Sequence, residues 1–408
     1  MDIKKACNTL NLKNNMKINT DKEKIDALLT RGVDEVIDKK DLEQKLLSGK
    51  QLKIKLGSDP TSPNLHIGRS IPLLKLRDFQ ELGHKIIFII GDFTGTIGDT
   101  SDKDSERPML DEKVINENLK TYIKQAGKII DIEKSEIRHN SEWLDKLKYK
   151  EISYQANQFS LNEFISRENI KKRLDAGKRV SLRELLYPLM QGYDSVAIEA
   201  DVEVGGTDQR FNILSGRALQ RHYKQEPQNI ITNPLIEGLD GRKMSSSWGN
   251  TVNLLDTPNN MYGKTMSLND DFIIKYFVLL TRVSPALIET YEQEIKSGAN
   301  PRDYKMKLAY ELVQFYHSQK DAKQAQNFFI QTFSRKEIPT DIPEIQPTTY
   351  NVMTALLESK CVKSKTEARR VIEQKGVKLN SKLIESSEQK IKSGDIIQKG
   401  KRTFIKIQ

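Results

Sequence analysis

Two segments of the sequence combine glycine with cationic and hydroxyl side chains in a way that suits phosphate binding. The first is GSDPTSPNLHIGRS at 57–70, in which His66 and Gly68 are expected at the start of a helix. Backbone N–H groups and the helix dipole favour phosphate there, and Gly68 lets an adenine or ribose approach closely. Arg69 adds a permanent positive charge. The second is GLDGRKMSSSWGN at 238–250, a loop able to fold over a triphosphate with Lys243 and its serines as donors.

Taken singly, neither segment specifies a function. The first fits a proline-rich turn with an ordinary capping histidine equally well, because four-residue patterns recur by chance. The second, by itself, is more typical of a solvated flexible loop.

A strand–helix–strand unit must position the first segment. QLKIKLG at 51–57 alternates in hydropathy, and KIIFIIGD at 85–92 is an apolar run typical of a strand buried on both faces. The intervening IPLLKLRDFQELG has helical spacing, with Pro72 either in its first turn or at a kink. Such a unit builds a parallel sheet, and open α/β sheets bind ligands at the carboxyl ends of their strands.

Further elements follow from the same periodicities. Strands are predicted at 200–206 and 229–235, with a helix from Asp208 between them, whereas residues 110–199 have mostly helical patterns. Thr20 is predicted to open the first helix as part of a capping box.

Composition narrows the class of protein. The 408 residues carry a net charge of +10, which suggests an anionic partner, and nucleic acid comes before membrane because no apolar run is long enough to span a bilayer. Only two cysteines occur, which excludes a disulfide scaffold and a zinc site built on thiolates alone. The first residues lack a signal-peptide core, although Met16 is a possible alternative start, so a cytoplasmic protein is expected.

The basic charge is concentrated at the C-terminus. Residues 350–408 contain 14 Lys or Arg against six Asp or Glu, which accounts for +8 of the net charge. Residues 336–349 carry a proline every fourth position and indicate a semi-rigid linker. We therefore expect a small RNA-binding domain at 350–408, whose phosphate contacts come from cations around the start of one helix: Lys363, Lys365, Arg369 and Arg370. A basic solvated face is the structural alternative.

The two glycine-containing segments together resemble the HIGH and KMSKS signatures of class I aminoacyl-tRNA synthetases. Longer segments at 90–110 and 187–214 narrow the resemblance to bacterial tyrosyl-tRNA synthetases, and it runs from about Thr20 to the C-terminus. The resemblance implies a Rossmann-like parallel-sheet α/β catalytic domain at 20–250, with a helical insertion at about 110–180. It also implies a helical domain at 251–335 and a C-terminal α+β domain similar to one in ribosomal protein S-four. Residues 1–19, which precede the resemblance, are polar and are expected to form a flexible arm.

Family roles carry over residue by residue. In YPLMQGYD at 187–194, the family Tyr and Gln hold the substrate ammonium and the Asp receives the phenol hydroxyl. By resemblance, the residues that contact tyrosine are Gly57, Asp59, Thr94, Asp99, Tyr187, Gln191, Asp194 and Gln209. Those that contact ATP are His66, Gly68, Gly206, Asp208, Lys243, Met244 and Ser246. Those that act on the phosphates are His66, Gly68, Arg69, Lys103, Arg107, Lys243, Ser245 and Ser246.

The sequence departs from the family pattern at three positions. Arg69 replaces the second His of the first signature, Ser246 replaces the second Lys of the other, and Lys55 stands where many members have a Tyr. Arg69 can still stabilise charge developing on pyrophosphate, whereas Ser246 removes a cation and leaves Lys243, Lys103 and Arg107. We therefore expect an active enzyme, and the role of Lys55 stays open.

The implied reaction joins L-tyrosine to ATP, releases pyrophosphate, and passes the tyrosyl group to tRNA-Tyr. Mg²⁺ is expected to enter with ATP rather than in a dedicated protein site, and the resemblance implies a homodimer. Two rivals remain. A tryptophanyl enzyme shares the fold, although an indole has no hydroxyl to meet Asp194. In a non-catalytic RNA-binding paralogue, Arg69 and Ser246 would mark lost ATP chemistry, although the tyrosine-pocket residues are retained.

Overall fold

The computed structural model describes residues 18–99, 109–334, 342–384, 386–400 and 403–408. The chain divides into two compact units. The first comprises Met1–Leu255 and Ile274–Lys296, and the second comprises Asp256–Ile273 and Ser297–Gln408. Among the described helices, none combines the length and the apolar character that a bilayer crossing requires.

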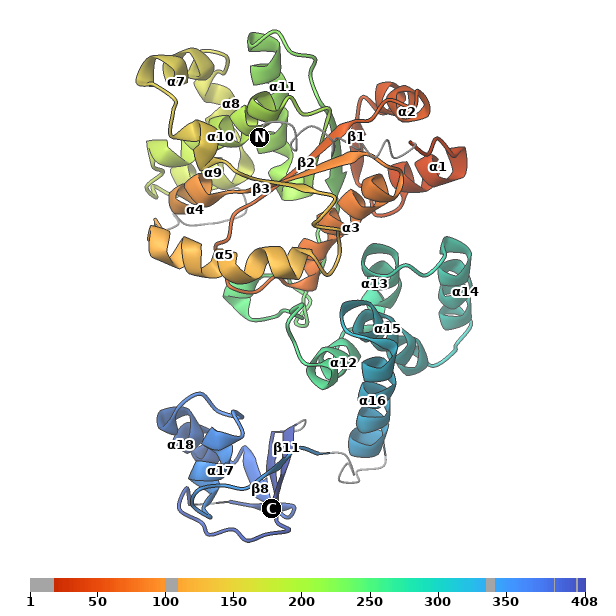
Figure 1. Ribbon diagram of the computed structural model, residues 1–408, viewed down its shortest axis with the longest axis vertical. Coiled ribbons are helices and arrows are strands. Elements are labelled where there is room, and N and C mark those ends of the chain that lie inside the picture. Colours follow the sequence, from red (N-terminus) through yellow and green to blue (C-terminus); the bar gives the residue numbers. More distant parts are fainter. Residues whose placement is uncertain (1–17, 100–108, 335–341, 385, 401–402) are drawn as a thin grey trace, which may run out of the picture. The chain divides into compact units, whose positions relative to one another are not determined.

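A six-stranded sheet forms the centre of the first unit, in the order β1-β6-β5-β2-β3-β4. All neighbouring pairs are parallel except β1 and β6. The predicted α/β class is therefore confirmed, and the four predicted strands form as β2, β3, β5 and β6 (Figure 1). The strands are β1 Glu35–Ile37, β2 Lys53–Ser58, β3 Lys85–Ile90, β4 Glu136–His139, β5 Val202–Gly206 and β6 Asn229–Asn233.

Two strands of this six-stranded sheet were not predicted from the sequence. β4 lies inside the stretch expected to be mostly helical, and β1 precedes the second helix. Both are too short, at four and three residues, for an alternating pattern to stand out from their polar surroundings. The expectation for 110–199 is corrected accordingly, because β4 extends the parallel sheet beyond β3.

The strand order creates a switch point between β2 and β5. From β2 the chain adds β3 and β4 on one side, and then returns to place β5 on the other side of β2. Loops that leave neighbouring strands in opposite directions open a crevice at the carboxyl ends of the strands. The first predicted phosphate-binding segment begins at the end of β2, and the GGTDQ segment at 205–209 begins at the end of β5, so both meet at this crevice.

Helices cover both faces of the sheet. Figure 1 shows α3 on one side and the α10–α11 pair on the other. Alternate residues of β3 meet the second face, where Ile87 and Ile89 share a core with Trp143 and Ile198. The helices before α12 are α1 Lys22–Thr30, α2 Lys39–Leu47, α3 Ile67–Glu81, α4 Asp92–Ile97, α5 Glu112–Ala126, α6 Ser141–Leu144, α7 Tyr149–Ala156, α8 Leu161–Ile165, α9 Glu168–Asp175, α10 Leu182–Ile198 and α11 Arg210–His222.

Helix boundaries differ slightly from the predictions. α1 begins one residue later than expected, because the Asp21 side chain rather than that of Thr20 accepts from the Lys24 N–H. Pro72 lies inside α3, one turn beyond its start. A 3₁₀ turn at Thr207–Gln209 precedes α11, which therefore starts at Arg210 rather than Asp208.

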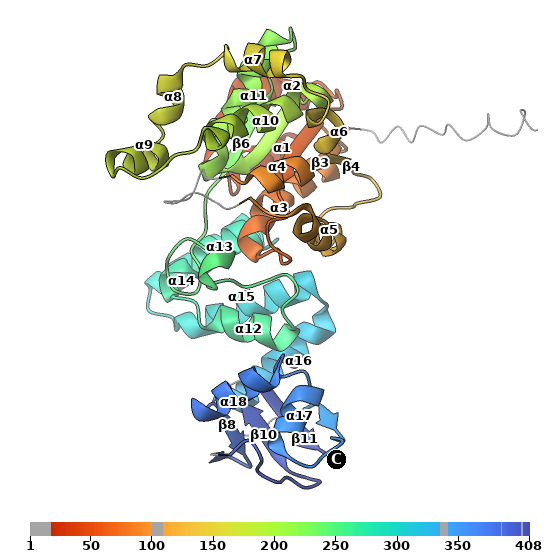
Figure 2. The same cartoon turned by 90° about the vertical axis from the view of Figure 1, so that its left-hand side faces the viewer.

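Figure 2 shows α8 and α9 standing away from the sheet. The helices α13 Ile273–Leu280 and α14 Pro285–Lys296 complete this part of the chain.

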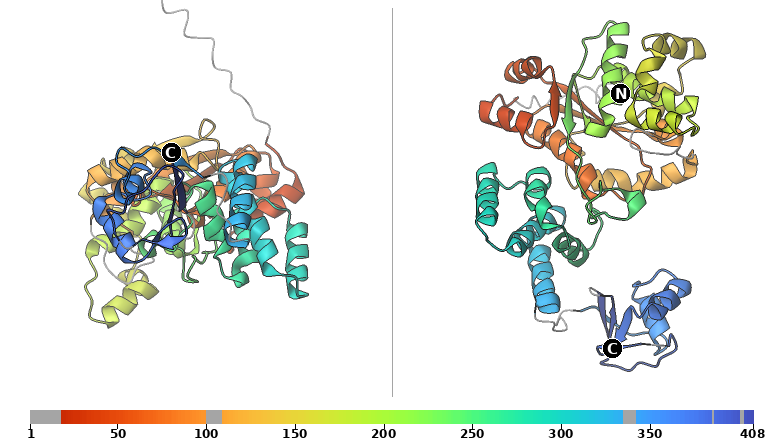
Figure 3. Two further views of the ribbon diagram at one scale, coloured as in Figure 1. Left: turned by 90° about the horizontal axis from the view of Figure 1, so that it is seen from below. Right: turned by 180° about the vertical axis from the view of Figure 1, so that it is seen from behind.

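The second unit contains a helical part and a small mixed α+β part. The helices of the former are α12 Pro258–Met266, α15 Pro301–Tyr316 and α16 Gln319–Phe329, with a 3₁₀ turn at Asp270–Phe272 and a π-helical turn at Ile330–Ser334. The small α+β part has a five-stranded sheet in the order β7-β11-β10-β8-β9, with α17 and α18 on one side (Figure 3). Its elements are β7 Glu344–Ile345, α17 Val352–Glu358, α18 Lys365–Glu373, β8 Val377–Leu379, β9 Lys382–Leu383, β10 Ile396–Lys399 and β11 Thr403–Ile407.

The small sheet has a closed apolar core of its own. Val352 and Leu356 from α17 and Ile372 from α18 pack on Ile397 and Ile405. The predicted hairpin forms as antiparallel β10 and β11. β7 lies within the residues predicted as the linker and pairs in parallel with β11, whereas residues 336–341 of that linker lie outside the described part of the chain.

Candidate active site

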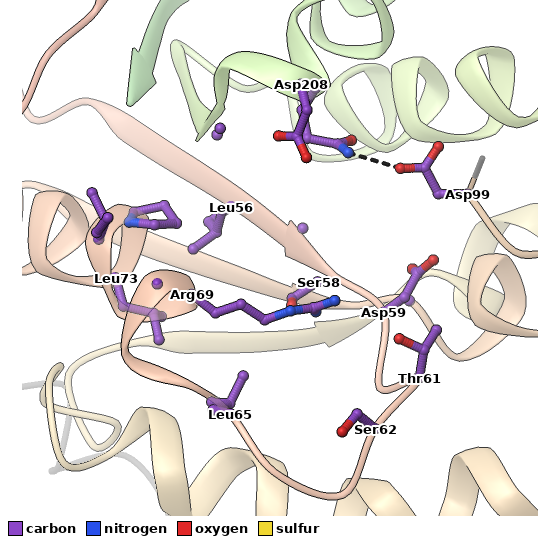
Figure 4. Close-up of a pocket in the computed structure, with 18 of the residues that line it drawn as sticks. Leu56, Ser58, Asp59, Thr61, Ser62, Leu65, Arg69, Leu73, Asp99 and Asp208 are labelled. Atoms are coloured by element: carbon purple, nitrogen blue, oxygen red, sulfur yellow. Dashed lines mark hydrogen bonds between the residues drawn. The ribbon is translucent and has the colours of Figure 1, made fainter. Parts of the chain in front are cut away.

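A cavity of about 830 Å³ opens at the switch point between β2 and β5. Its walls come from the β2–α3 loop, the start of α4, one face of α10, the β5–α11 turn and the loop at 243–248 (Figure 4). Every described residue predicted for the tyrosine, ATP and phosphate contacts lines it, namely Gly57, Asp59, His66, Gly68, Arg69, Thr94, Asp99, Tyr187, Gln191, Asp194, Gly206, Asp208, Gln209, Lys243, Met244, Ser245 and Ser246. Lys103 and Arg107 lie outside the described residues.

Helix α10 brings three of these residues to one wall of the cavity. Its start is fixed by a capping box in which Ser181 caps the Arg183 N–H and the Glu184 side chain accepts from the Ser181 N–H. Spacings of four and three then place Tyr187, Gln191 and Asp194 on one helix face.

Asp194 is a buried carboxylate with two donors already in place. Trp143 Nε1 donates to Asp194 Oδ1 at 2.8 Å, and Asn140 Nδ2 lies 3.4 Å from Oδ2. Burial raises the pKa of Asp194 to about 7, against the lowering effects of the Lys55 charge and the Trp143 hydrogen bond. The sequence did not reveal Asn140 or Trp143 as part of this wall, because they come from the stretch around β4 and α6.

Asp59, directly after β2, is a second carboxylate of the cavity wall and is partly buried. Thr94 Oγ1 donates to its Oδ1 at 2.7 Å and the Tyr187 hydroxyl donates to its Oδ2 at 2.8 Å. Burial raises the pKa of Asp59 to about 6, while these two hydrogen bonds lower it. Gly91 permits this arrangement, because a Cβ there would lie 1.9 Å from Asp59 Oδ1.

Asp99 and Gln209 are hydrogen-bonded to each other at the cavity wall. Gln209 Nε2 donates to Asp99 Oδ2 at 2.7 Å, which Figure 4 marks as a dashed line. Asn212 Nδ2 lies 3.2 Å from Gln209 Oε1, so the amide of Gln209 is held at both ends. A carboxylate and an amide in this arrangement can receive an ammonium group and donate to a carboxylate of a bound amino acid.

Cations and a neutral imidazole gather at the start of α3. His66 is the N-cap of α3 and is buried, and its pKa is lowered to about 3 by burial and by the charges of Arg69 and Lys243. Its imidazole is therefore neutral at physiological pH. Arg69 Nη1 donates to the Tyr122 hydroxyl at 3.2 Å, and Tyr122 in turn meets Ser58 at 2.7 Å. Tyr122 on α5 is a further residue that the sequence did not reveal.

Lys243 is the cation of the second phosphate-binding segment. Its Nζ lies 2.8 Å from Asp208 Oδ2, which belongs to the β5–α11 turn. Gly206 precedes that turn and lines the cavity with Asp208. The two predicted segments and the GGTDQ turn therefore converge on one anion-sized region of the cavity.

Asn250 holds the second segment in shape. Its Oδ1 accepts from the Ser245 N–H at 2.9 Å, and its Nδ2 donates to Asp240 Oδ1 at 2.7 Å. Gly238 is required beside it, because a Cβ at that position would lie 2.5 Å from Asn250. Arg242 stacks over the ring of Trp248, 4.7 Å from its centroid. These contacts fix the shape of the loop whose serines line the cavity.

The cations predicted to contact RNA lie on the small α+β part of the second unit. Ser364 caps α18, with its side chain accepting from the Glu367 N–H. Around this cap the four predicted side chains are exposed, namely Lys363, Lys365, Arg369 and Arg370. The opposite face of α18 buries Ala368 and Ile372 in the small core.

The residues of this chain match two known families. Residues 47–334 match the family described as tRNA synthetases class I (W and Y), and residues 352–397 match the S4 domain. A tyrosine–tRNA ligase of Thermotoga maritima is 43% identical over 93% of this chain and 96% of its own length. One from Ralstonia nicotianae is 45% identical over 92% and 98%.

A solved structure supports the same relationship. The C-terminally truncated mitochondrial tyrosyl-tRNA synthetase of Coccidioides posadasii superimposes with a TM-score of 0.60 at 25% identity, over 74% of this chain and 91% of that one. With a matched segment of this extent and relatives of this identity along nearly the whole chain, the protein belongs to the class I tRNA synthetases of the tryptophan and tyrosine group, with a C-terminal S4 domain.

Proposed function

We propose that the chain is a tyrosine–tRNA ligase that activates L-tyrosine with ATP and transfers it to the 3′ end of tRNA-Tyr. The names of its full-length relatives support this assignment. The observation that carries it is Asp194, a buried carboxylate at the cavity wall with Trp143 and Asn140 as fixed donors. ATP–pyrophosphate exchange with single amino acids tests the assignment.

Tyrosine binding uses the two ends of the α10 wall. The phenol hydroxyl donates to Asp194, and the ammonium group is received by Gln191 and Asp99 together with the Tyr187 hydroxyl. A buried acceptor left unpaired costs more free energy than a loose apolar fit, so phenylalanine is rejected. Gly57, Asp59 and Thr94 shape the wall between these ends, and Gln209 faces the reacting carboxylate.

The first chemical step needs no covalent nucleophile from the protein. A carboxylate oxygen of tyrosine attacks the α-phosphorus of ATP, and the bond to the bridging oxygen breaks as pyrophosphate leaves. Arg69 and Lys243 stabilise the charge that develops on pyrophosphate, with the hydroxyls of Ser245 and Ser246 as further donors. His66 stays neutral and acts as a hydrogen-bonding group beside Gly68, which leaves room for the nucleotide.

The second step transfers the acyl group. A ribose hydroxyl of the terminal tRNA nucleotide attacks the tyrosyl carbonyl carbon, and AMP leaves with its phosphate oxygen. Asp208 and Gly206 would contact the ribose of the adenylate, and Met244 lines the same cavity. Mg²⁺ would enter as part of the ATP substrate, since phosphate oxygens provide its preferred ligands.

The pKa of Asp194 predicts a pH dependence of tyrosine binding. Only the ionised carboxylate is the full acceptor for the phenol, and its pKa is about 7 in the unoccupied pocket. The ionised fraction falls from about nine-tenths at pH 8 to about one-tenth at pH 6, so we expect the KM for tyrosine to rise roughly ninefold as the pH falls across this range. Steady-state exchange kinetics at saturating ATP measure this change, and a KM that stays constant between pH 8 and pH 6 would contradict it.

The exposed cations of α18 predict a separate effect on RNA. Replacing Arg369 and Arg370 by Ala should raise the KM for tRNA about tenfold and weaken its salt dependence, while tyrosine activation stays unchanged, because phosphate contacts contribute affinity without contacting the cavity. Lys406→Ala is the matched control on the same small sheet, since Lys406 is already paired with Glu344 at 2.7 Å. An unchanged KM for tRNA in the double variant would place the RNA contacts elsewhere.

We further propose a homodimer, formed through the helical insertion and acting in the cytoplasm. Apolar side chains are exposed along this insertion, with Leu161 at 63% and Leu182 at 77% exposure. Exposed apolar side chains gathered in one segment are typical of a protein–protein interface.

A further inference from the structure

A buried ion pair lies directly behind the tyrosine-facing row of α10. Lys55 of β2 is fully buried and Glu203 of β5 is 1% exposed, with Lys55 Nζ 3.0 Å from Glu203 Oε1. The two strands are those that flank the switch point. Burial of an ion pair usually costs as much free energy as the attraction returns, so the pair adds little stability unless its geometry serves another purpose.

The Lys55 ammonium has a partner for each of its three N–H donors. Besides Glu203, it donates to the backbone oxygen of Gln191 at 2.9 Å and to Ser195 Oγ at 2.8 Å. Ser195 Oγ donates onward to Glu203 Oε2 at 3.0 Å. Lys55, Glu203 and Ser195 therefore form a hydrogen-bonded group, which we call the buried triad, and Glu203 Oε2 also accepts from Gln228 Nε2 at 2.6 Å.

The buried triad determines which end of the Gln191 amide faces the cavity. Gln191 Nε2 donates to Glu203 Oε1 at 3.3 Å. An amide has donors at one end and an acceptor at the other, so engaging Nε2 with Glu203 leaves Oε1 to accept from a substrate ammonium. Turned over, the same amide would present N–H donors to a cation and would repel it.

The buried triad also brackets Asp194 along α10. Gln191 lies three residues before Asp194, and Ser195 directly follows it, so contacts to both fix this turn of the helix. The charge of Lys55 lowers the pKa of Asp194 against burial, whereas that of Glu203 raises it. Other charged or titratable groups around the row are Tyr187 and Asp59, which are engaged with each other.

We propose that the buried triad of Lys55, Glu203 and Ser195 positions the tyrosine pocket, orienting the Gln191 amide toward the substrate ammonium and fixing the turn of α10 that carries Asp194. This inference rests on the proposed function. It assigns a role in substrate binding to a group of which Glu203 lines the cavity and Lys55 and Ser195 lie behind it.

The experiment is a double replacement of Lys55 and Glu203 by Met. Apolar residues of similar volume remove both buried charges together, so the melting temperature should stay within a few degrees of the parent. The KM for tyrosine in ATP–pyrophosphate exchange should rise about tenfold or more, while the KM for ATP changes less than about threefold. Lys53→Met is the matched control from the same strand, because Lys53 pairs with Glu199 at 3.1 Å and should leave both KM values unchanged.

A second variant keeps the inference testable if the double variant does not fold. Ser195→Ala removes the hydroxyl between Lys55 and Glu203 without removing a charge, and it should raise the KM for tyrosine about threefold to tenfold with that for ATP unchanged. An unchanged KM for tyrosine in a folded variant would overturn the inference, and so would equal increases in both KM values, which indicate a general loss of structure. Failure of the parent protein to exchange with tyrosine would instead overturn the proposed function.

Discussion

Replacing Asp194 by Ala should reduce kcat/KM for tyrosine about 100-fold, because it leaves the phenol hydroxyl without its acceptor in a buried pocket. In the unaltered protein Trp143 Nε1 donates to Asp194 Oδ1 at 2.8 Å, so the same change also leaves the Trp143 N–H without an acceptor and lowers the stability of the protein. Each unsatisfied buried group costs about 1–3 kcal/mol. The loss should fall on tyrosine binding, since Asp194 lies away from the cations that meet ATP.

The same variant should lose its preference for tyrosine over phenylalanine. Phenylalanine pays a penalty in the unaltered protein because it brings no hydroxyl to donate to Asp194, and the variant removes that penalty. Exchange kinetics with both amino acids measure the ratio. Asp145→Ala is the control, because Asp145 is an exposed carboxylate at the end of the helix that carries Trp143. Retention of the tyrosine preference in Asp194→Ala would refute the assigned contact.

Replacing Lys243 by Met should lower kcat for tyrosine activation by about 10²–10³-fold and leave the KM for tyrosine unchanged. Lys243 meets charge that develops on pyrophosphate only as the α-phosphate bond breaks. Its importance is increased because Ser246 occupies the position at which the family pattern has a second lysine. In the resting structure Lys243 is paired with Asp208 at 2.8 Å, and ATP phosphates would compete for it.

Rapid-quench measurement of adenylate formation in a single turnover gives this rate directly. The control is Arg242→Met, which removes the neighbouring cation of the same loop, one that pairs with Asp240 and stacks on Trp248. We expect its rate to stay within about fivefold of the parent, because Arg242 is not among the residues that line the cavity and its charge is paired with Asp240. Equal losses in the two variants would mean that Lys243 acts through loop structure rather than through phosphate charge.

The sequence predicted the sheet centre well because its strands carry strong signals. KIIFII at β3 is apolar throughout, as expected for a strand covered on both faces. β2 shows why such predictions stop short of the site. Its alternation correctly marks Ile54 and Leu56 as buried, yet Lys55 between them is fully buried as well, since α10 covers the other face. The burial of the Lys55 charge is tolerated because Glu203, a partner distant in the sequence, pairs with it.

The residues of the cavity also divide into those that the sequence predicts and those that it does not. Residues within contiguous motifs, such as Tyr187, Gln191 and Asp194, could be predicted from spacing and family resemblance. Trp143 and Tyr122 could not, because their roles arise from chain segments that meet only in the folded protein, around a carboxylate and an arginine respectively. Neither side chain lies in a recognisable motif, and an aromatic residue at helical spacing indicates only a core position.

The most direct test of tyrosine activation is ATP–pyrophosphate exchange by the purified full chain with Mg²⁺, supplying each of the twenty amino acids separately. The structure predicts exchange with tyrosine alone, because Asp194 supplies a buried acceptor for the phenol and Arg69 and Lys243 supply the pyrophosphate cations. Exchange with tryptophan instead would contradict the role of Asp194. A folded protein that binds RNA but exchanges with no amino acid would show that Arg69 and Ser246 belong to a site without ATP chemistry.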